Sequence, residues 1–210
     1  MSAGILYTIS APSGAGKTSL VRALLEREDG LALSVSHTTR PRRDGERDGV
    51  DYYFVDDATF QEMVDAGAFL EHARVFDNRY GTSRRVVEET LAGGFDLVLE
   101  IDWQGAHQVR ESVEGAISIF ILPPSRAALV ERLQGRGLDS DEVIERRMAA
   151  AIDEMSHYDE CDYLVVNDDF EDALADLRGI VRAGRVQRPR QAARHRALIE
   201  ALLAPPDAVQ

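Results

Sequence analysis

The sequence predicts an α/β fold in which a mostly parallel sheet is flanked by helices. Short apolar runs with strand character alternate along the chain with segments of helical periodicity, an alternation typical of parallel sheets. The first run leads through a glycine-rich loop into a helical pattern. The 210-residue chain is 44% hydrophobic and 29% charged, close to the globular average, so it can form one compact unit with a real core.

The expected strands are short runs of apolar, β-branched or aromatic residues. They cover residues 6–10, 31–36, 52–55, 69–76, 96–101, 116–122 and 163–166. The helix after the first strand covers residues 17–26, where Leu20, Val21, Leu24 and Leu25 form one apolar stripe. Parallel strands joined in this way place their carboxyl ends at one edge of the sheet, where ligands bind in open α/β folds.

Further helices are expected where a capping residue precedes a helical pattern that stops at glycine. They run from Asp57 to Gly67, from Ser83 to Gly93 and from Ser125 to the neighbourhood of Gly135. A long helical pattern over residues 139–158 follows a glycine-rich break at residues 135–137. We expect the helices on either side of this break to project as a movable cover.

Charge and cysteine content exclude several classes of protein. The formal net charge is −13 at pH 7, so nucleic acid and anionic membranes would be repelled over most of the surface. No apolar run approaches the roughly 20 residues of a membrane span, and the N-terminus lacks the pattern of a signal peptide. A single cysteine, Cys161, cannot form an intrachain disulfide. We therefore expect a cytoplasmic protein that binds small molecules and neither nucleic acid nor membranes.

One basic segment interrupts this acidic background. Residues 182–196 hold six arginines and no acidic residue. A solvated helix or a contact between subunits is expected here rather than a nucleic-acid site. A contact between subunits would make the protein a homo-oligomer, and this alternative stays open.

Residues 11–18 match the phosphate-loop pattern GxxxxGK[ST], except that alanine replaces the first glycine. They are Ala11, Pro12, Ser13, Gly14, Ala15, Gly16, Lys17 and Thr18. The loop follows a strand and opens a helix, so its backbone N–H groups and the helix N-terminus can bind the phosphates of a nucleoside triphosphate. Lys17 would neutralise the β and γ oxygens, and the Thr18 hydroxyl would be a ligand of Mg²⁺.

A second candidate for the metal lies at the end of the expected strand over residues 96–101. Glu100 and Asp102 lie at its carboxyl end, and either could organise Mg²⁺ through water. An apolar strand that ends in an acidic residue is common, so exposed strand-end charges remain the alternative.

Several further segments closely resemble the guanylate kinases. In chain order they read SVSHTTR, GVDYYFV, FLEHA, YGTS, DWQG, GRG and VNDD. The resemblance extends from Gly4 to Leu203 and is to the bacterial type. It implies a P-loop kinase core at residues 1–35, 86–125 and 159–210. It also implies a small mixed GMP-binding subdomain at residues 36–85 and a helical lid at residues 126–158.

The resemblance further implies a set of GMP-binding residues. They are Ser36, Arg40, Arg43, Tyr52, Glu71, Tyr80, Thr82 and Asp102. Arginine forks suit a doubly charged phosphate, and a carboxylate matches the two donors, N1–H and the N2 amine, on the guanine edge. Without the resemblance, residues 40–48 could be a salt-bridged surface loop and Glu71 a solvent-facing strand residue. The family usually has proline where Arg42 stands, which leaves the roles of Arg42 and Arg43 open.

The lid and the donor site complete the implied machinery. Arg132, Arg136 and Arg147 match lid arginines of the family, and Arg132 and Asn167 are the ATP-binding positions beyond the loop. The catalytic residues that the resemblance implies are Lys17, Arg40, Arg43, Arg136 and Arg147. The implied reaction is ATP + GMP ⇌ ADP + GDP with Mg²⁺, and it needs no general base because the attacking phosphate is already ionised. The alternatives are a catalytically silent guanylate-kinase-like interaction module and a relative that phosphorylates a ribose bisphosphate.

Overall fold

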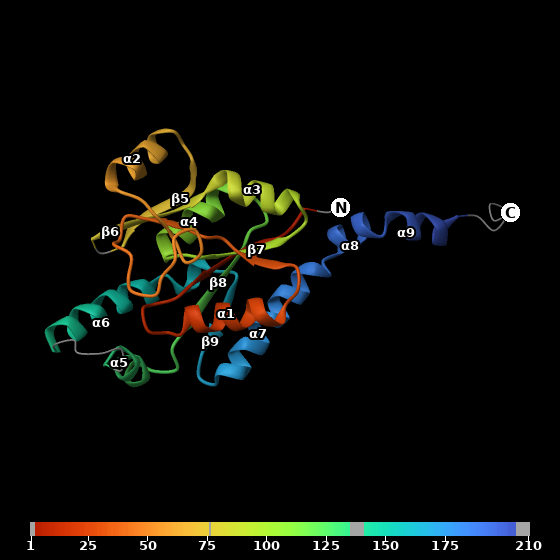
Figure 1. Cartoon of the computed structure of the whole chain (residues 1–210). Coiled ribbons are helices and arrows are strands. Elements are labelled where there is room, and N and C mark those ends of the chain that lie inside the picture. Colours follow the sequence, from red (N-terminus) through yellow and green to blue (C-terminus); the bar gives the residue numbers. More distant parts are fainter. Residues whose placement is uncertain (1–2, 76, 135–140, 205–210) are drawn as a thin grey trace.

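The computed structural model describes residues 3–75, 77–134 and 141–204, and it contains two sheets (Figure 1). All strands of the larger sheet are parallel, in the order β2-β7-β1-β8-β9. They are β1 Leu6–Ser10, β2 Leu31–Leu33, β7 Asp96–Glu100, β8 Ile117–Leu122 and β9 Tyr163–Val166. The predicted α/β fold with a parallel sheet is confirmed.

The smaller sheet is mixed and has the order β4-β3-β6-β5. Its strands are β3 His37–Thr38, β4 Tyr53–Phe54, β5 Phe69–Val75 and β6 Asn78–Ser83. β3 pairs in parallel with β4 and antiparallel with β6, which also pairs antiparallel with β5. This sheet corresponds to the small mixed subdomain that the sequence led us to expect.

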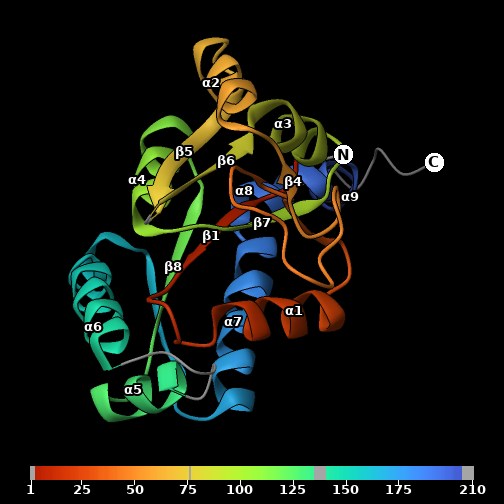
Figure 2. The ribbon, with the colours of Figure 1, turned by 60° about the vertical axis from the view of Figure 1, so that its left-hand side comes forward.

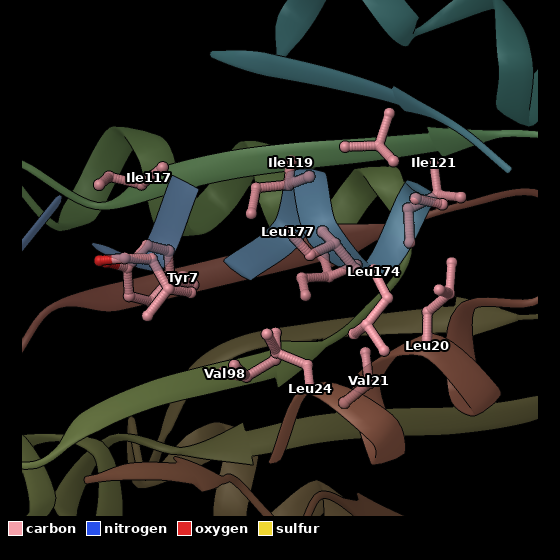
Figure 3. Close-up of a cluster of buried hydrophobic side chains, with 14 of the residues drawn as sticks. Tyr7, Leu20, Val21, Leu24, Val98, Ile117, Ile119, Ile121, Leu174 and Leu177 are labelled. Atoms are coloured by element: carbon pink, nitrogen blue, oxygen red, sulfur yellow. The ribbon is translucent and has the colours of Figure 1, made fainter. Parts of the chain in front are cut away.

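Helices cover both faces of the larger sheet. They are α1 Lys17–Arg27, α3 Arg84–Ala92, α4 Trp103–Ser112 and α7 Phe170–Arg185. One face packs on α1 and α7 through a cluster that includes Tyr7, Leu24 and Leu177 (Figure 3). The other face carries Leu6 and packs on α3 and α4. Neighbouring residues of β1 thus point to opposite, equally buried faces, which explains why this strand reads as a continuous apolar run.

The remaining helices lie outside these two layers. They are α2 Asp57–Asp65, α5 Arg126–Gln134, α6 Asp141–Ser156, the 3₁₀ helix η1 Tyr158–Glu160, α8 Arg188–Arg194 and α9 Arg196–Leu203. α5 and α6 pack together through Leu129, Leu133 and Ala151, and both views place them at one end of the molecule (Figure 2). Within the described residues, no helix combines the length and the apolar character that a membrane crossing requires.

Element boundaries differ from the expectations at a few residues. The strand expected over residues 31–36 ends at Leu33, because the chain then crosses to the smaller sheet. Asp56, not Asp57, caps α2, with its Oδ1 accepting from the Thr59 N–H at 2.7 Å. The long helical pattern over residues 139–158 corresponds to α6, which ends at Ser156 before η1.

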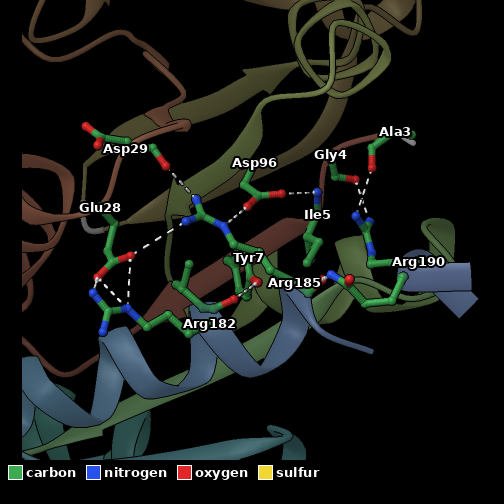
Figure 4. A network of polar contacts seen from close by, with 12 residues as sticks. Ala3, Gly4, Ile5, Tyr7, Glu28, Asp29, Asp96, Arg182, Arg185 and Arg190 are labelled. Atoms are coloured by element: carbon green, nitrogen blue, oxygen red, sulfur yellow. Dashed lines mark hydrogen bonds and ion pairs between the residues drawn. The ribbon is translucent and has the colours of Figure 1, made fainter. Parts of the chain in front are cut away.

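Three arginines of the arginine-rich segment make polar contacts inside the chain (Figure 4). Arg182 is still exposed, as expected for a solvated face, whereas Arg185 and Arg190 are only partly exposed, so the expectation of a solvated or intersubunit face is wrong for these two. Arg182 Nη2 lies 3.0 Å from Glu28 Oε1, and Arg185 Nε lies 2.7 Å from Asp96 Oδ2. Arg190 donates to the carbonyl oxygens of Ala3 and Gly4. The arginines tie α7 and α8 to the core, whereas α9 continues away from it (Figure 1).

Candidate active site

The phosphate loop connects β1 to α1 at the carboxyl edge of the parallel sheet. Gly14 and Gly16 have φ angles of +92° and +94°, a left-handed conformation that costs glycine little and other residues more. Gly16 is the N-cap of α1 and no side chain caps this helix, so the first amides of α1 are available for a ligand. The loop lines a cavity of about 250 Å³.

Lys17 and Thr18 both point to the end of β7. Lys17 Nζ donates to the Ile101 carbonyl oxygen at 2.9 Å, and Thr18 Oγ1 donates to a carboxylate oxygen of Glu100. A hydroxyl and a carboxylate beside a phosphate loop are the hard oxygen ligands that suit Mg²⁺, which keeps waters and phosphate oxygens as its other ligands. The residues present therefore fit the expected metal.

Two residues that the resemblance associates with ATP donate hydrogen bonds to the backbone of the phosphate loop. Asn167 Nδ2 donates to the Ala15 carbonyl oxygen at 2.7 Å. Arg132 contacts the same oxygen at 3.4 Å and the Asn167 carbonyl oxygen at 3.1 Å. A Cβ atom on Gly16 would lie 2.4 Å from Asn167 Nδ2, so glycine is needed for this close approach. Arg132 and Asn167 thus hold the backbone that would bind phosphate.

A buried carboxylate lines the same cavity. Glu71 is 3% exposed and accepts a hydrogen bond from the Thr82 hydroxyl, which lies 3.5 Å from Ser36 Oγ. Burial raises the pKa of Glu71 to about 7, and the nearby Asp102 carboxylate adds to this effect, against the Thr82 bond. The structure thus brings Glu71, Ser36 and Thr82 together from β5, β6 and the segment before β3.

Gly105 and Asp102 shape the space around this carboxylate. A Cβ on Gly105 would lie 2.5 Å from Glu71 Oε2, so a larger residue there would displace the carboxylate. Asp102 is the N-cap of α4 and accepts from the Gly105 N–H at 2.9 Å. Its carboxylate therefore has a structural partner and also lines the cavity.

Arg40 is part of an aromatic cluster at the cavity. Its guanidinium forms an ion pair with Glu46 at 2.6 Å and lies 5.4 Å from the centre of the Tyr52 ring. The Tyr52 and Tyr80 rings meet edge to face at 6.0 Å, and both residues line the cavity. Burial and the Glu100 carboxylate raise the pKa of Tyr52, so its hydroxyl stays protonated as a donor. The structure brings Arg40, Tyr52 and Tyr80 together.

The other predicted arginines do not line the cavity in the part of the chain that the structure describes. Arg43 is exposed, and its backbone N–H donates to Glu46 at 2.8 Å, so the structure does not bring its side chain to Tyr52 and Tyr80. Arg147 is half-buried on α6, and Arg136 lies outside the described residues.

One acidic residue of the cavity was missed by sequence reasoning. Glu154 on α6 accepts a hydrogen bond from the Ser13 N–H of the phosphate loop at 3.1 Å. An acidic residue in an amphipathic helix gives no signal that separates a buried role from a solvated one. Only the placement of α6 beside the loop reveals it.

A phosphate loop at the carboxyl edge of a parallel sheet, faced by a mixed sheet with a buried carboxylate, defines a P-loop kinase of the nucleoside monophosphate kinase class. The family model described as guanylate kinase matches residues 4–184. The chain belongs to the guanylate kinase family. The resemblance seen in the sequence is therefore confirmed.

Similar proteins cover nearly the whole chain. The guanylate kinase of Methylococcus capsulatus is 62% identical over 203 residues, which span 97% of this chain and 100% of the relative. The guanylate kinase of Escherichia coli is 57% identical over 206 residues, with 97% and 100% coverage. The crystal structure of guanylate kinase from Anaplasma phagocytophilum matches with a TM-score of 0.77 at 37% identity, covering 96% of each chain.

Proposed function

We propose that this protein transfers the γ-phosphoryl group of ATP to GMP, giving ADP and GDP. The observation that carries the proposal is the buried Glu71 with Thr82 and Ser36, in the same cavity as the phosphate loop. A carboxylate accepts two hydrogen bonds side by side, which matches guanine N1–H and the N2 amine. The distribution of these groups supports a donor phosphate at one end of the cavity and a guanine at the other.

The loop and the start of α1 bind the donor in this proposal. Backbone N–H groups and the helix N-terminus hold the phosphates, and Lys17 neutralises the oxygens on which charge develops. Thr18 and Glu100 would hold Mg²⁺, which supplies further neutralisation of phosphate charge when it is bound. Arg132 and Asn167 keep the loop in its binding conformation through the Ala15 carbonyl oxygen.

Arg40, Tyr52 and Tyr80 bind the phosphate of GMP in this proposal. Arg43 joins them if the exposed loop that carries it folds inward. An oxygen of the ionised GMP phosphate attacks the γ-phosphorus, a new P–O bond forms, and the bond to the β-phosphate oxygen breaks with its electrons going to ADP. No side chain has to remove a proton, so positioning and charge neutralisation carry the catalysis.

The helices α5 and α6 act as the lid in this proposal. Arg136 and Arg147 would reach the transferring phosphoryl group once the lid folds over both substrates, and closure would exclude water that otherwise hydrolyses ATP. The cytoplasmic location, the absence of nucleic-acid partners and a homo-oligomer stay predictions.

A panel of acceptors tests the proposal against its alternatives. ADP release from ATP and Mg²⁺ should be fast with GMP and slow with AMP, CMP, UMP and ribose 1,5-bisphosphate. A catalytically silent interaction module would release ADP with none of them. A ribose-bisphosphate kinase would respond to the last compound alone, and it would not need the base-reading set around Glu71.

A further inference from the structure

A carboxylate on α6 accepts a hydrogen bond from a backbone N–H of the phosphate loop. Glu154 Oε2 accepts from the Ser13 N–H at 3.1 Å, although the two residues are 141 positions apart in the chain. Both residues line the cavity that also contains Lys17 and Thr18. Figure 2 shows α6 beside the loop that leads from β1 to α1.

The surroundings of Glu154 are those of a bound anion. Burial raises the pKa of its carboxyl group, whereas the Ser13 N–H and the charge of Lys17 act in the opposite direction. Lys17 and the loop N–H groups are the partners expected for the phosphates of ATP. The Glu154 carboxylate thus stands where a phosphate oxygen is expected, and two anions cannot share this donor without repulsion.

The same carboxylate connects α6 to the core. The apolar contacts of α6 through Ala151, Met148 and Met155 are made with α5, its neighbour in the expected lid. The hydrogen bond from Ser13 to Glu154 instead joins α6 to the loop between β1 and α1. Loss of this bond would therefore remove this direct link between α6 and the phosphate loop without disturbing the packing of α6 on α5, which keeps its own contact with the loop through Arg132.

We propose that Glu154 is a positioning residue that holds α6 against the empty phosphate loop and competes with ATP for the Ser13 N–H. ATP binding then displaces the carboxylate and releases α6 for closure. This inference rests on the proposed function, because it takes ATP as the ligand of the loop.

ATP affinity in the absence of any acceptor tests the competition. Calorimetry should show that Glu154→Gln binds ATP about tenfold more tightly than the wild type, because the amide keeps the acceptor oxygen but loses the charge. Glu145→Gln is the matched control, since it makes the same change at an exposed position on the same helix and should leave the affinity unchanged. Equal or weaker ATP binding by Glu154→Gln would overturn the proposal.

Hydrogen exchange of the α6 amides without nucleotide tests the anchor. Glu154→Ala should speed exchange in α6 several-fold, whereas Glu154→Gln, which can still accept from Ser13, should not. Unchanged exchange in Glu154→Ala would refute the anchoring role. The calorimetric titration contains no phosphoryl acceptor, so its result does not depend on whether GMP is the acceptor. Failure of the wild type to bind ATP would count against the proposed function instead.

Discussion

Glu71 shows how one buried side chain can favour function at a cost in stability. Its carboxylate has one hydroxyl donor, Thr82, and lies near the like charge of Asp102. Burial of an ionised carboxylate with few hydrogen-bond donors is unfavourable. The neutral acid is therefore favoured, and the pKa of Glu71 rises to about 7. Two donors on a guanine edge would supply the missing hydrogen bonds, so the empty protein should be strained at this residue in a way that the ligand relieves.

The stability of the nucleotide-free protein should reveal this strain. The folded pKa of about 7 lies above the ordinary value of 4.5, so the contribution of Glu71 is fully present below the unfolded pKa and is lost as pH rises through 7. Between about pH 5 and about pH 8 the wild type should lose roughly 2 to 3 kcal/mol relative to Glu71→Gln. Urea titrations of both proteins at the two pH values measure this difference. A constant difference would mean that Glu71 titrates normally.

Lys17 should matter for turnover and little for folding. Among the hydrogen bonds described, its ammonium group donates only to the Ile101 carbonyl oxygen. The side chain therefore adds little to the apolar core. Lys17→Ala should lower kcat by about 10²- to 10³-fold, the loss typical of one preorganised charge-stabilising donor. Circular dichroism and the urea midpoint should stay near those of the wild type. Turnover that survives the substitution would remove residues 11–18 from the donor site.

In the proposed function, the segment between β2 and β4 supplies Arg40 and Tyr52 to the acceptor phosphate site. Arg40→Ala should raise KM for GMP about 10- to 100-fold, the loss expected for a charge-assisted hydrogen bond, and leave KM for ATP nearly unchanged. Steady-state kinetics with each substrate varied in turn measures the two effects. The same two KM values in Arg43→Ala serve as the comparison for Arg40→Ala, because the structure leaves the Arg43 side chain exposed. Equal effects on both substrates would indicate a misfolded segment instead.

The central strands could be predicted from the sequence because they are buried on both faces. β1 and β8 read as short continuous apolar runs, and the glycine-rich loop after β1 identifies the donor site. In the smaller sheet, the runs over residues 52–55 and 69–76 predicted β4 and β5, whereas β3 and β6 were not expected. β3 has two residues, and β6 carries mostly polar residues, so no alternation marks them.

Contacts within the site depend on pairings that the sequence does not express. Glu71 meets Thr82 because β5 and β6 pair antiparallel, with a shift in register just before Glu71. The need for glycine at position 105 follows from the close approach of α4 to β5. The resemblance to guanylate kinases identified the residues, but only the tertiary structure shows that Arg43 lies apart and that Glu154 lies inside the cavity.

At the scale of the whole molecule, the account requires α5 and α6 to move relative to the core. Both substrates present their phosphates to the same region, so Arg136 and Arg147 gain a shared anion only when donor and acceptor are bound together. A two-substrate analogue should therefore reduce the radius of gyration in small-angle X-ray scattering. Partial compaction with ATP alone would agree with release of α6. Identical dimensions with and without the analogue would refute a moving lid.

The proposed function requires one cavity that contains both a phosphate loop and a carboxylate that selects guanine. AMP presents an acceptor at N1 and has no N2 amine, so it leaves the buried Glu71 carboxylate without donors from the base, with the Thr82 hydroxyl as its partner. A site of this kind can support discrimination of about 10⁴-fold in kcat/KM. Glu71→Gln should reduce GMP turnover and narrow this preference, because an amide can donate to adenine N1 and no longer presents two acceptors.

The most direct measurement is the ratio of kcat/KM for GMP to kcat/KM for AMP, in the wild type and in Glu71→Gln, under identical Mg²⁺ and ATP. We predict a large ratio in the wild type that falls by at least about tenfold in the variant, with GMP losing most of the activity. A ratio that the substitution leaves unchanged would contradict the account and move base recognition from Glu71 to Ser36, Thr82 and Asp102.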